Sequence, residues 1–134
     1  MSELNKTLED VFGYTSFRPG QEEVINHLMQ KKKLLAVMPT GAGKSLCYQL
    51  PALLFENQTV VVSPLVALMD DQVIGLKDLG VKAERVHSGM PESQRTQIWE
   101  DFKNKQIKIL YISPESLMRN EMLSALKPLN ISMF

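Results

Sequence analysis

The chain has 134 residues, of which 44% are hydrophobic, and its 15 basic side chains balance 15 acidic ones. This length suits one domain with one core, and the composition is that of an ordinary globular protein. The balanced charge gives no support for a strongly basic nucleic-acid-binding protein, although it leaves room for a local basic patch. The single cysteine, Cys47, excludes an internal disulfide, and no apolar run reaches membrane-spanning length. We therefore expect a cytoplasmic protein with no membrane partner.

The N-terminal part of the chain predicts two helices. Apolar residues recur at helical spacing over residues 3–12 and predict a short amphipathic helix, with Thr7 as its candidate cap and Gly13 at its end. Pro19 suits the first turn of a second helix, which the basic run 31–33 closes.

Strands and helices alternate strictly in the rest of the chain. Short apolar runs predict strands at 34–38, 59–63, 83–87 and 107–112, and a further run begins at 129. Helices are expected over 44–55, 65–79, from 91 onward, and 115–126. Pro51 predicts a kink or a break in the first of these four helices, near Leu50. The alternation predicts an α/β fold with a parallel sheet covered by helices.

The most specific motif lies between the first expected strand and the helix after it. Its sequence is Met38-Pro39-Thr40-Gly41-Ala42-Gly43-Lys44-Ser45. A strand, a glycine loop, Gly-Lys-Ser and a helix are typical of a phosphate-binding loop, whose backbone N–H groups and helix start face phosphate oxygens. Lys44 would reach the β and γ phosphates, and the Ser45 hydroxyl would hold Mg²⁺. The strict pattern has glycine where this chain has Met38, and an ordinary glycine-rich turn is the alternative.

Polar and proline residues follow the predicted strands. They are Met38-Pro39, Ser63-Pro64, His87-Ser88 and Ser113-Pro114. Ligands of parallel sheets bind beyond the carboxyl ends of the strands, so this edge is a candidate binding surface. Loop punctuation by proline is the alternative.

Four motifs together resemble RecQ-type DNA helicases over residues 12–134. They are Phe12-Gly13-Tyr14 with Phe17-Arg18-Pro19-Gly20-Gln21, the phosphate loop including Met38, the segment from Ser63 to Val73, and Tyr111-Ile112-Ser113-Pro114-Glu115-Ser116-Leu117. The resemblance implies a P-loop NTPase fold of the RecA-like type, with helices on both faces of the sheet. Residues 1–134 would be part of the first RecA-like domain.

The resemblance also implies ATP and Mg²⁺ as cofactors, with Lys44 as the catalytic residue. The implied nucleotide-binding residues are Tyr14, Arg18, Gln21, Thr40, Gly41, Ala42, Gly43, Lys44 and Ser45. Gln21 would read adenine through its carboxamide, Tyr14 would stack on the base, and Arg18 would help to hold the nucleotide. For Tyr14 and Arg18, ordinary surface and cap roles are the alternative.

A second group of residues is expected to track one strand of DNA, either single-stranded or at a duplex junction. The group comprises Pro64, Leu65, Ser88, Ser113 and Pro114, and each could instead serve only its turn or helix cap. The family resemblance suggests 3′ to 5′ travel, roles in repair and recombination, and association with the nucleoid in a bacterium.

The family has parts with no counterpart in this sequence. The Asp-Glu-Ala-His box expected on the strand near Ile131, which holds Mg²⁺ and positions the attacking water, is absent, as is the second RecA-like domain. We therefore expect a domain incomplete at its C-terminus that binds ATP without hydrolysing it. The alternatives are a non-catalytic nucleotide- or DNA-binding remnant, or another P-loop phosphotransferase, which the scattered Arg85, Arg95 and Arg119 do not favour.

Overall fold

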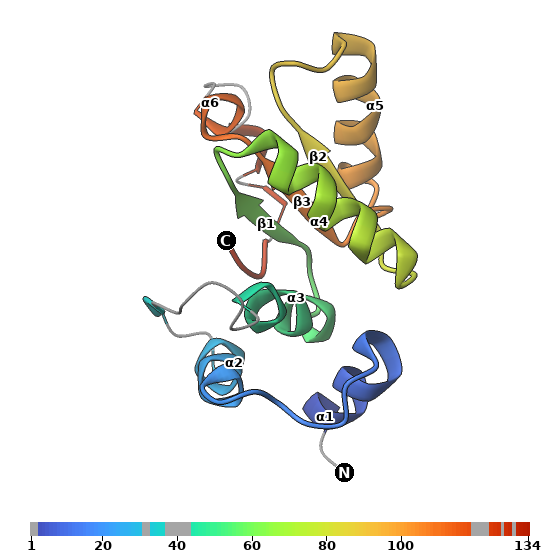
Figure 1. Cartoon of the computed structure of the whole chain (residues 1–134). Helices are drawn as coiled ribbons and strands as arrows, with labels where there is room; N and C mark the ends of the chain where they lie inside the picture. The colour runs from blue at the N-terminus through green and yellow to red at the C-terminus, as the bar shows by residue number, and fades with distance from the viewer. Residues whose placement is uncertain (1–2, 31–32, 37–43, 119–123, 127, 130) are drawn as a thin grey trace. The chain divides into compact units, whose positions relative to one another are not determined.

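The computed structural model describes residues 3–30, 33–36, 44–118, 124–126, 128–129 and 131–134 (Figure 1). The chain forms two compact units, Met1–Phe55 and Glu56–Phe134, and each is described by itself. Within the described ranges, every helix is too short or too polar to cross a membrane.

The first unit begins with two helical segments where the sequence predicted one. Helix α1 (Glu3–Thr7) leads into a π-helical turn, η1 (Leu8–Phe12), which Gly13 ends with a φ of 77°. The end at Gly13 is confirmed. The cap at Thr7 is wrong, because its side chain makes no cap hydrogen bond. Thr7 has helical backbone angles (φ −65°, ψ −39°), so it lies inside continuous helical backbone rather than at an extended cap position.

Helices α2 (Gln21–Met29) and α3 (Lys44–Leu54) pack against each other in this unit. Their core holds Leu8, Ile25, Leu46 and Leu50. Helix α2 begins after Gly20, whose φ is 85°, so Pro19 precedes the helix and does not form its first turn.

Of the kink or break predicted near Leu50, a break is wrong, because α3 runs through Pro51 to Leu54. Proline removes only its own N–H from the helix, and the Phe55 N–H still donates to the Pro51 carbonyl at 3.0 Å. Cys47 is buried on this helix, and burial raises the pKa of its thiol. A thiol held protonated in a packed helix is a core residue, not a reactive one.

The predicted strand at 34–38 is not formed over residues 34–36, and residues 37 and 38 lie outside the described part of the chain. A strand requires a hydrogen-bonded neighbour. Among the described residues, β1, β2 and β3 pair with one another, and Thr59 also bridges to Met133, so none of them pairs with residues 34–36. The Leu35 side chain is accordingly 88% exposed.

The second unit is built on a three-stranded parallel sheet. Its strands are β1 (Thr59–Val62), β2 (Ala83–Val86) and β3 (Ile109–Ile112), in the order β1-β3-β2. The helices are α4 (Val66–Asp78), α5 (Glu92–Lys103) and α6 (Pro114–Leu117). The α/β fold with a parallel sheet is therefore confirmed. The strand expected near residue 131 contributes a parallel bridge between Met133 and Thr59.

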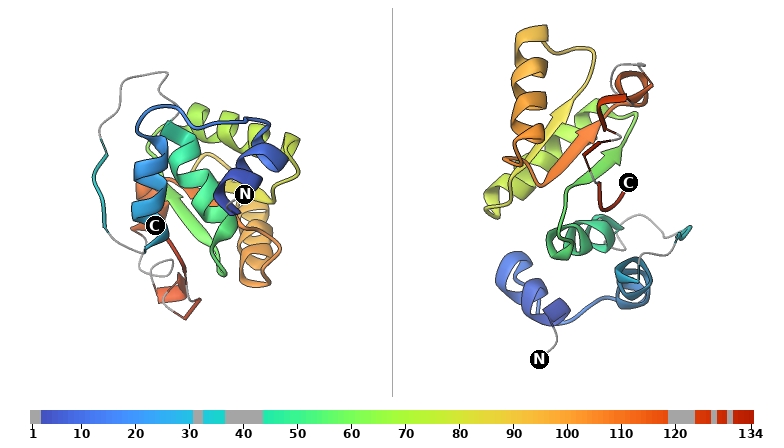
Figure 2. Two further views of the ribbon diagram at one scale, coloured as in Figure 1. Left: turned by 90° about the horizontal axis from the view of Figure 1, so that it is seen from below. Right: turned by 180° about the vertical axis from the view of Figure 1, so that it is seen from behind.

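Helices α4 and α5 cover opposite faces of this sheet (Figures 1 and 2). Successive residues of a strand point to opposite faces, and all four residues of the central strand β3 are buried. Leu110 and Ile112 share one core with Ile98 and Phe102 of α5. Helix α4 packs on β2 and β3 and ends at Asp78. Gly80, two residues later, has a φ of 83°, and its N–H donates to the Lys77 carbonyl at 2.9 Å.

The buried side chain of Gln58 ties together the amino edge of the sheet. Its Nε2 donates to the carbonyl of Phe102 at 2.6 Å and to that of Ile107 at 2.7 Å. Its own carbonyl accepts from the Ser132 N–H at 2.9 Å. Beside it, Lys108 Nζ donates to the Asn57 carbonyl at 2.8 Å, and burial lowers the pKa of this amine. One amide therefore joins the end of α5 to the start of β3.

Replacing Gln58 by leucine should lower the free energy of unfolding by about 2–4 kcal/mol, because two buried carbonyls lose their donor. The matched control is Gln97→Leu, which removes an exposed bond to Asp101 on the surface of α5 and should cost under about 0.5 kcal/mol. Urea unfolding measures both changes. Equal losses for the two variants would contradict the role assigned to Gln58.

Candidate functional site

The expected adenine-reading residue, Gln21, is the first residue of α2 and is only 3% exposed. Its Oε1 accepts from the Arg18 N–H at 2.8 Å, and its own N–H donates to the Arg18 carbonyl at 3.1 Å. The two bonds fix the carboxamide against the backbone that leads into the helix. Tyr14 follows Gly13 and is 55% exposed, so its ring has an open face. Tyr14, Arg18 and Gln21 thus lie within one short stretch of the first unit.

Lys44 and Ser45 open helix α3. Lys44 is exposed and makes no ion pair or hydrogen bond with the described part of the chain, whereas Ser45 is half-buried. The positive end of a helix of this length adds to the Lys44 ammonium, so the two together suit a phosphate group. The expected contacts at Thr40, Gly41, Ala42 and Gly43 lie outside the described residues.

Mg²⁺ would find only part of its coordination here. No three His, Cys, Asp or Glu side chains gather into a metal site among residues 3–30, 33–36, 44–118 and the described residues after them. Mg²⁺ commonly keeps several waters and takes the rest of its oxygens from one or two side chains and from substrate phosphates. The Ser45 hydroxyl fits the role of one such ligand.

The second group of candidate residues meets at the carboxyl edge of the sheet in the other unit. Val62, Ile112 and Val86 lie in one register row. The Ser63 N–H donates to the Ile112 carbonyl at 3.1 Å, and the Ser113 N–H donates to the Val86 carbonyl at 3.2 Å. The three loops therefore leave the sheet from adjacent strands, about 5 Å apart. The predicted gathering at one edge is confirmed for residues 63–64, 87–88 and 113–114. The fourth predicted pair, Met38-Pro39, lies outside the described residues.

Each of these loops is folded by the side chain that directly follows its strand. The Ser63 hydroxyl accepts from the Leu65 N–H at 3.3 Å, and His87 Nδ1 accepts from the Gly89 N–H at 3.2 Å. The Ser113 hydroxyl accepts from the Ser116 N–H at 3.3 Å and donates to the Ser116 hydroxyl at 2.9 Å. Sequence reasoning missed this shared device. For two of the three loops the sequence does carry a signal, which is a serine followed by proline directly after a strand. The hydroxyl of such a serine commonly accepts from the backbone N–H two or three residues later.

The five residues expected to contact DNA differ in exposure. Pro64, Leu65 and Ser88 are exposed, and Pro114 is half-buried. Ser113 is 6% exposed, and its hydroxyl is engaged as the cap of α6. A contact at Ser113 would therefore come through the loop that it holds rather than through its side chain.

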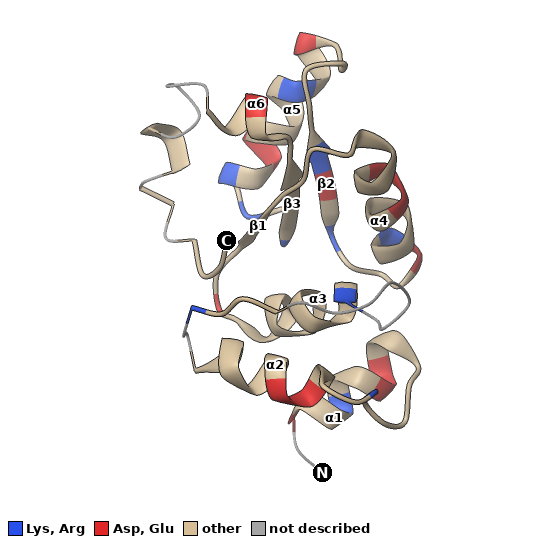
Figure 3. Cartoon of the chain, turned by 60° about the vertical axis from the view of Figure 1, so that its left-hand side comes forward, with Lys and Arg blue, Asp and Glu red and all other residues tan. Residues whose placement is uncertain are grey.

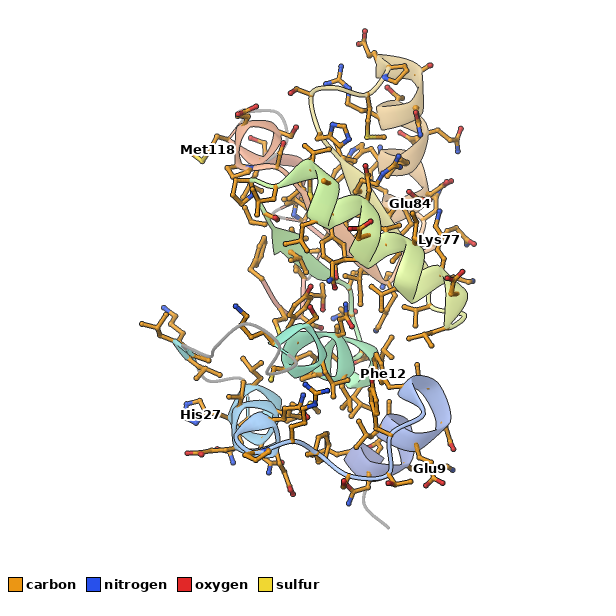
Figure 4. All side chains as sticks on the ribbon, in the orientation of Figure 1. Glu9, Phe12, His27, Lys77, Glu84 and Met118 are labelled. Carbon is orange, nitrogen blue, oxygen red and sulfur yellow. The ribbon has the colours of Figure 1, made fainter. Side chains whose placement is uncertain are left out.

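Charged residues tie α4 to β2 beside this edge (Figures 3 and 4). Arg85 donates to Asp70 at 2.8 Å and lies 3.4 Å from Glu84, and Glu84 also pairs with Lys77. Figure 4 shows Lys77 on α4 and Glu84 on β2 side by side. These ion pairs are partly exposed, so each contributes little to stability, but together they hold α4 along β2, with Asp70 near the start of the helix and Lys77 near its end.

Comparison with known proteins matches residues 18–131 to the DEAD/DEAH box helicase family. The chain is 50% identical over 113 residues to the ATP-dependent DNA helicase RecQ of Haemophilus influenzae, and 47% identical over 115 residues to that of Synechocystis. These matches cover 84% and 86% of the chain. The chain spans only 18% and 24% of the length of these two relatives.

Solved helicase structures share the fold. A hypothetical ATP-dependent RNA helicase from Sulfolobus tokodaii matches with a TM-score of 0.71 and 23% identity, over 93% of this chain and 37% of that one. The DUF1998 helicase MrfA bound to DNA matches with a TM-score of 0.70 and 23% identity, over 87% of this chain and 18% of that one. The RecA-like fold expected from the sequence is thereby confirmed.

Replacing Ser113 by alanine should lower the free energy of unfolding by about 1–2 kcal/mol, since α6 loses its cap and the buried Ser116 hydroxyl loses its partner. Ser63→Ala is the matched control, because it removes the corresponding bond in an exposed turn and should cost less. Chemical unfolding of both variants makes the comparison. A larger loss for Ser63→Ala would be inconsistent with this ranking of the two loops.

Proposed function

Because the chain belongs to the DEAD/DEAH box helicase family, we propose that it binds Mg²⁺-ATP and one strand of DNA as part of an ATP-dependent DNA helicase. The observation that carries the proposal is Lys44, an exposed ammonium without a partner among the described residues, at the first position of α3 and directly after Gly-x-Gly. An unpaired cation at a helix start is suited to phosphate, and the family match supplies the nucleotide.

The nucleotide roles follow from the chemistry of each side chain. Lys44 holds the β and γ phosphates, the backbone of residues 40–43 wraps the phosphates, and the Ser45 hydroxyl is a ligand of Mg²⁺. Mg²⁺, when bound, neutralises the charge that develops on the phosphate oxygens.

The adenine roles fall to the stretch before α2. The Gln21 carboxamide, whose oxygen accepts from the Arg18 N–H, offers an oxygen that suits the adenine N6–H and an amide N–H that suits N7. Guanine presents an acceptor where adenine presents the N6 donor, so this carboxamide disfavours GTP. Tyr14 stacks on the base, and Arg18 contributes positive charge.

The DNA role rests on the carboxyl edge of the second unit. Pro64, Leu65, Ser88, Ser113 and Pro114 lie on its three loops and suit sugar-phosphate contacts that carry no sequence information. The relatives are named as DNA helicases, which favours DNA over RNA. We extend to this protein the 3′ to 5′ travel and the repair and recombination role that the resemblance implies.

The residues of this sequence supply binding groups rather than a complete catalytic set. In the family an Asp-Glu pair at a strand end holds Mg²⁺ and positions water, and no Asp-Glu sequence occurs in the 134 residues. Our proposal for these residues is therefore ATP binding without turnover.

Replacing Lys44 by alanine should weaken ATP binding at least tenfold, because a charge-assisted contact to phosphate contributes about 1.5–3 kcal/mol. Lys6→Ala, which removes an exposed lysine of α1, is the control and should leave the dissociation constant within about twofold. Isothermal titration with ATP and Mg²⁺ measures both. Unchanged affinity in Lys44→Ala would overturn the proposed nucleotide site.

Replacing Gln21 by glutamate should abolish the preference for ATP over GTP, which we expect to be about tenfold or more in the wild-type chain. Glutamate keeps the acceptor for the Arg18 N–H but lacks the donor for N7. The ratio of the two affinities is the readout, since added negative charge weakens both nucleotides alike. Gln30→Glu, in an exposed position after α2, should keep the wild-type ratio.

A further inference from the structure

The loop between β2 and α5 brings several donors to the carboxyl edge of the sheet. Residues 87–91 leave the end of β2 and lead directly into α5, so the start of that helix lies at the same edge as the other two loops (Figure 1). The loop contains Ser88, already a candidate for a DNA contact. Its surroundings therefore decide what this part of the edge can bind.

Arg95 is the fourth residue of α5, and one N–H donor of its side chain has no acceptor. Its N–H donates to the Pro91 carbonyl at 3.1 Å, which places the residue one turn into the helix. The side-chain Nε is buried without a hydrogen-bond partner, and Arg95 forms no ion pair with any described residue. Buried donors are nearly always satisfied in folded proteins, so this guanidinium calls for an acceptor.

The direction of the Arg95 side chain follows from its place on the helix. Arg95 is three residues before Ile98, which packs in the core with Val86 and Met90, so both residues lie on the sheet-facing side of α5. Side chains of a helix lean toward its N-terminus. The Arg95 guanidinium is thereby directed to the side of the 87–91 loop.

The start of α5 adds a second source of positive potential. The helix has 12 residues, and its cap residue, Pro91, makes no side-chain cap hydrogen bond. The first N–H groups of a helix without such a cap are available to an anion. Glu92 is the acidic residue of the first turn, is exposed, and forms no ion pair with Arg95 among the described residues.

His87 supplies a third donor. Because its Nδ1 accepts from the Gly89 N–H, the proton of the neutral ring is on Nε2, which bonds to nothing in the described part of the chain. A Cβ on Gly89 would lie 3.2 Å from His87 Nδ1, so a side chain at this position would crowd the imidazole ring. The ring is held in one orientation while its outer N–H is left for a ligand.

We propose that Arg95, the start of α5 and His87 Nε2 form a binding site for a phosphodiester group of single-stranded DNA, with Arg95 as its cation. This inference rests on the proposed DNA role of the same edge and names the groups that give it affinity. The fork of guanidinium N–H donors matches phosphate oxygens. The Nε itself is buried, so it reaches a phosphate oxygen only when the side chain moves on binding. On this proposal the Arg95 side chain serves to bind phosphate. It makes no hydrogen bond or ion pair with the described residues, so such bonds contribute nothing to the free energy of unfolding of the free chain.

The test compares Arg95→Gln with Lys103→Gln, which removes one positive charge from the other end of the same helix, where Lys103 pairs with Glu100 at 2.8 Å. Anisotropy of a labelled oligo(dT), measured over a series of salt concentrations, gives affinity and salt slope together. Arg95→Gln should weaken binding about tenfold and reduce the slope of log K against log salt by about 0.7, the value for one phosphate on a single strand. Lys103→Gln should change neither.

Two further variants separate the parts of the site. His87→Asn keeps an acceptor for the Gly89 N–H but replaces the ring and its outer Nε2 donor by a shorter amide, so it should weaken binding about threefold to tenfold with no change in salt slope. Arg95→Lys keeps the charge and loses the fork, so it should keep the slope and weaken binding less than Arg95→Gln. Thermal unfolding of all variants should stay near the wild-type midpoint, because Arg95 has no partner to lose.

Equal effects of Arg95→Gln and Lys103→Gln on affinity and slope would overturn the site. A wild-type chain that binds ATP but no oligo(dT) would also overturn it, while leaving the nucleotide function intact. Conversely, Arg95-dependent DNA binding in a chain that fails to bind ATP would support the site and refute the proposed nucleotide role.

Discussion

The unstaggered parallel pairing of β1, β3 and β2 is the constraint on which the second unit depends. Val62, Ile112 and Val86 end their strands in one row, so three loops that are distant in sequence leave the sheet side by side. A slip of one residue in either ladder would turn the buried side chains of β3 to the wrong faces. The four buried residues of β3 and the Gln58 clamp at the amino edge therefore hold the register that assembles the candidate DNA surface.

The loops owe their shapes to polar side chains rather than to apolar packing. Ser63, His87 and Ser113 each follow a strand and bond a backbone N–H two or three residues on. These bonds satisfy loop backbone groups that would otherwise need water. The nucleotide half of the account rests on a similar local device in the first unit, where Gln21 and Arg18 bond each other at the start of α2.

Much of this architecture could be predicted from sequence because its signals are local and periodic. The alternation of strands and helices, the turn at Gly80 that follows α4 and the meeting of the strand ends all follow from residue types and spacing. The predictions of a helix cap at Thr7 and of a helix break at Pro51 were wrong, because a helix can continue through residue types that are common at helix ends. The strand predicted at 34–38 is not formed over residues 34–36, because a strand needs a hydrogen-bonded partner and a local sequence pattern does not show one. Arg95 could not be singled out, since its missing acceptor is visible only in three dimensions.

The central claim is that two groups of residues bind two different ligands, ATP in the first unit and a DNA strand at the carboxyl edge of the second. Backbone amide chemical shifts, followed by NMR during separate titrations with a non-hydrolysable ATP analogue and with oligo(dT), test it most directly. The account predicts that the nucleotide shifts amides of residues 14–21 and 40–46, and that the oligonucleotide shifts those of residues 63–65, 87–95 and 113–114. Shifts from both ligands on one group of residues, or an oligonucleotide effect confined to α2 and α3, would contradict it.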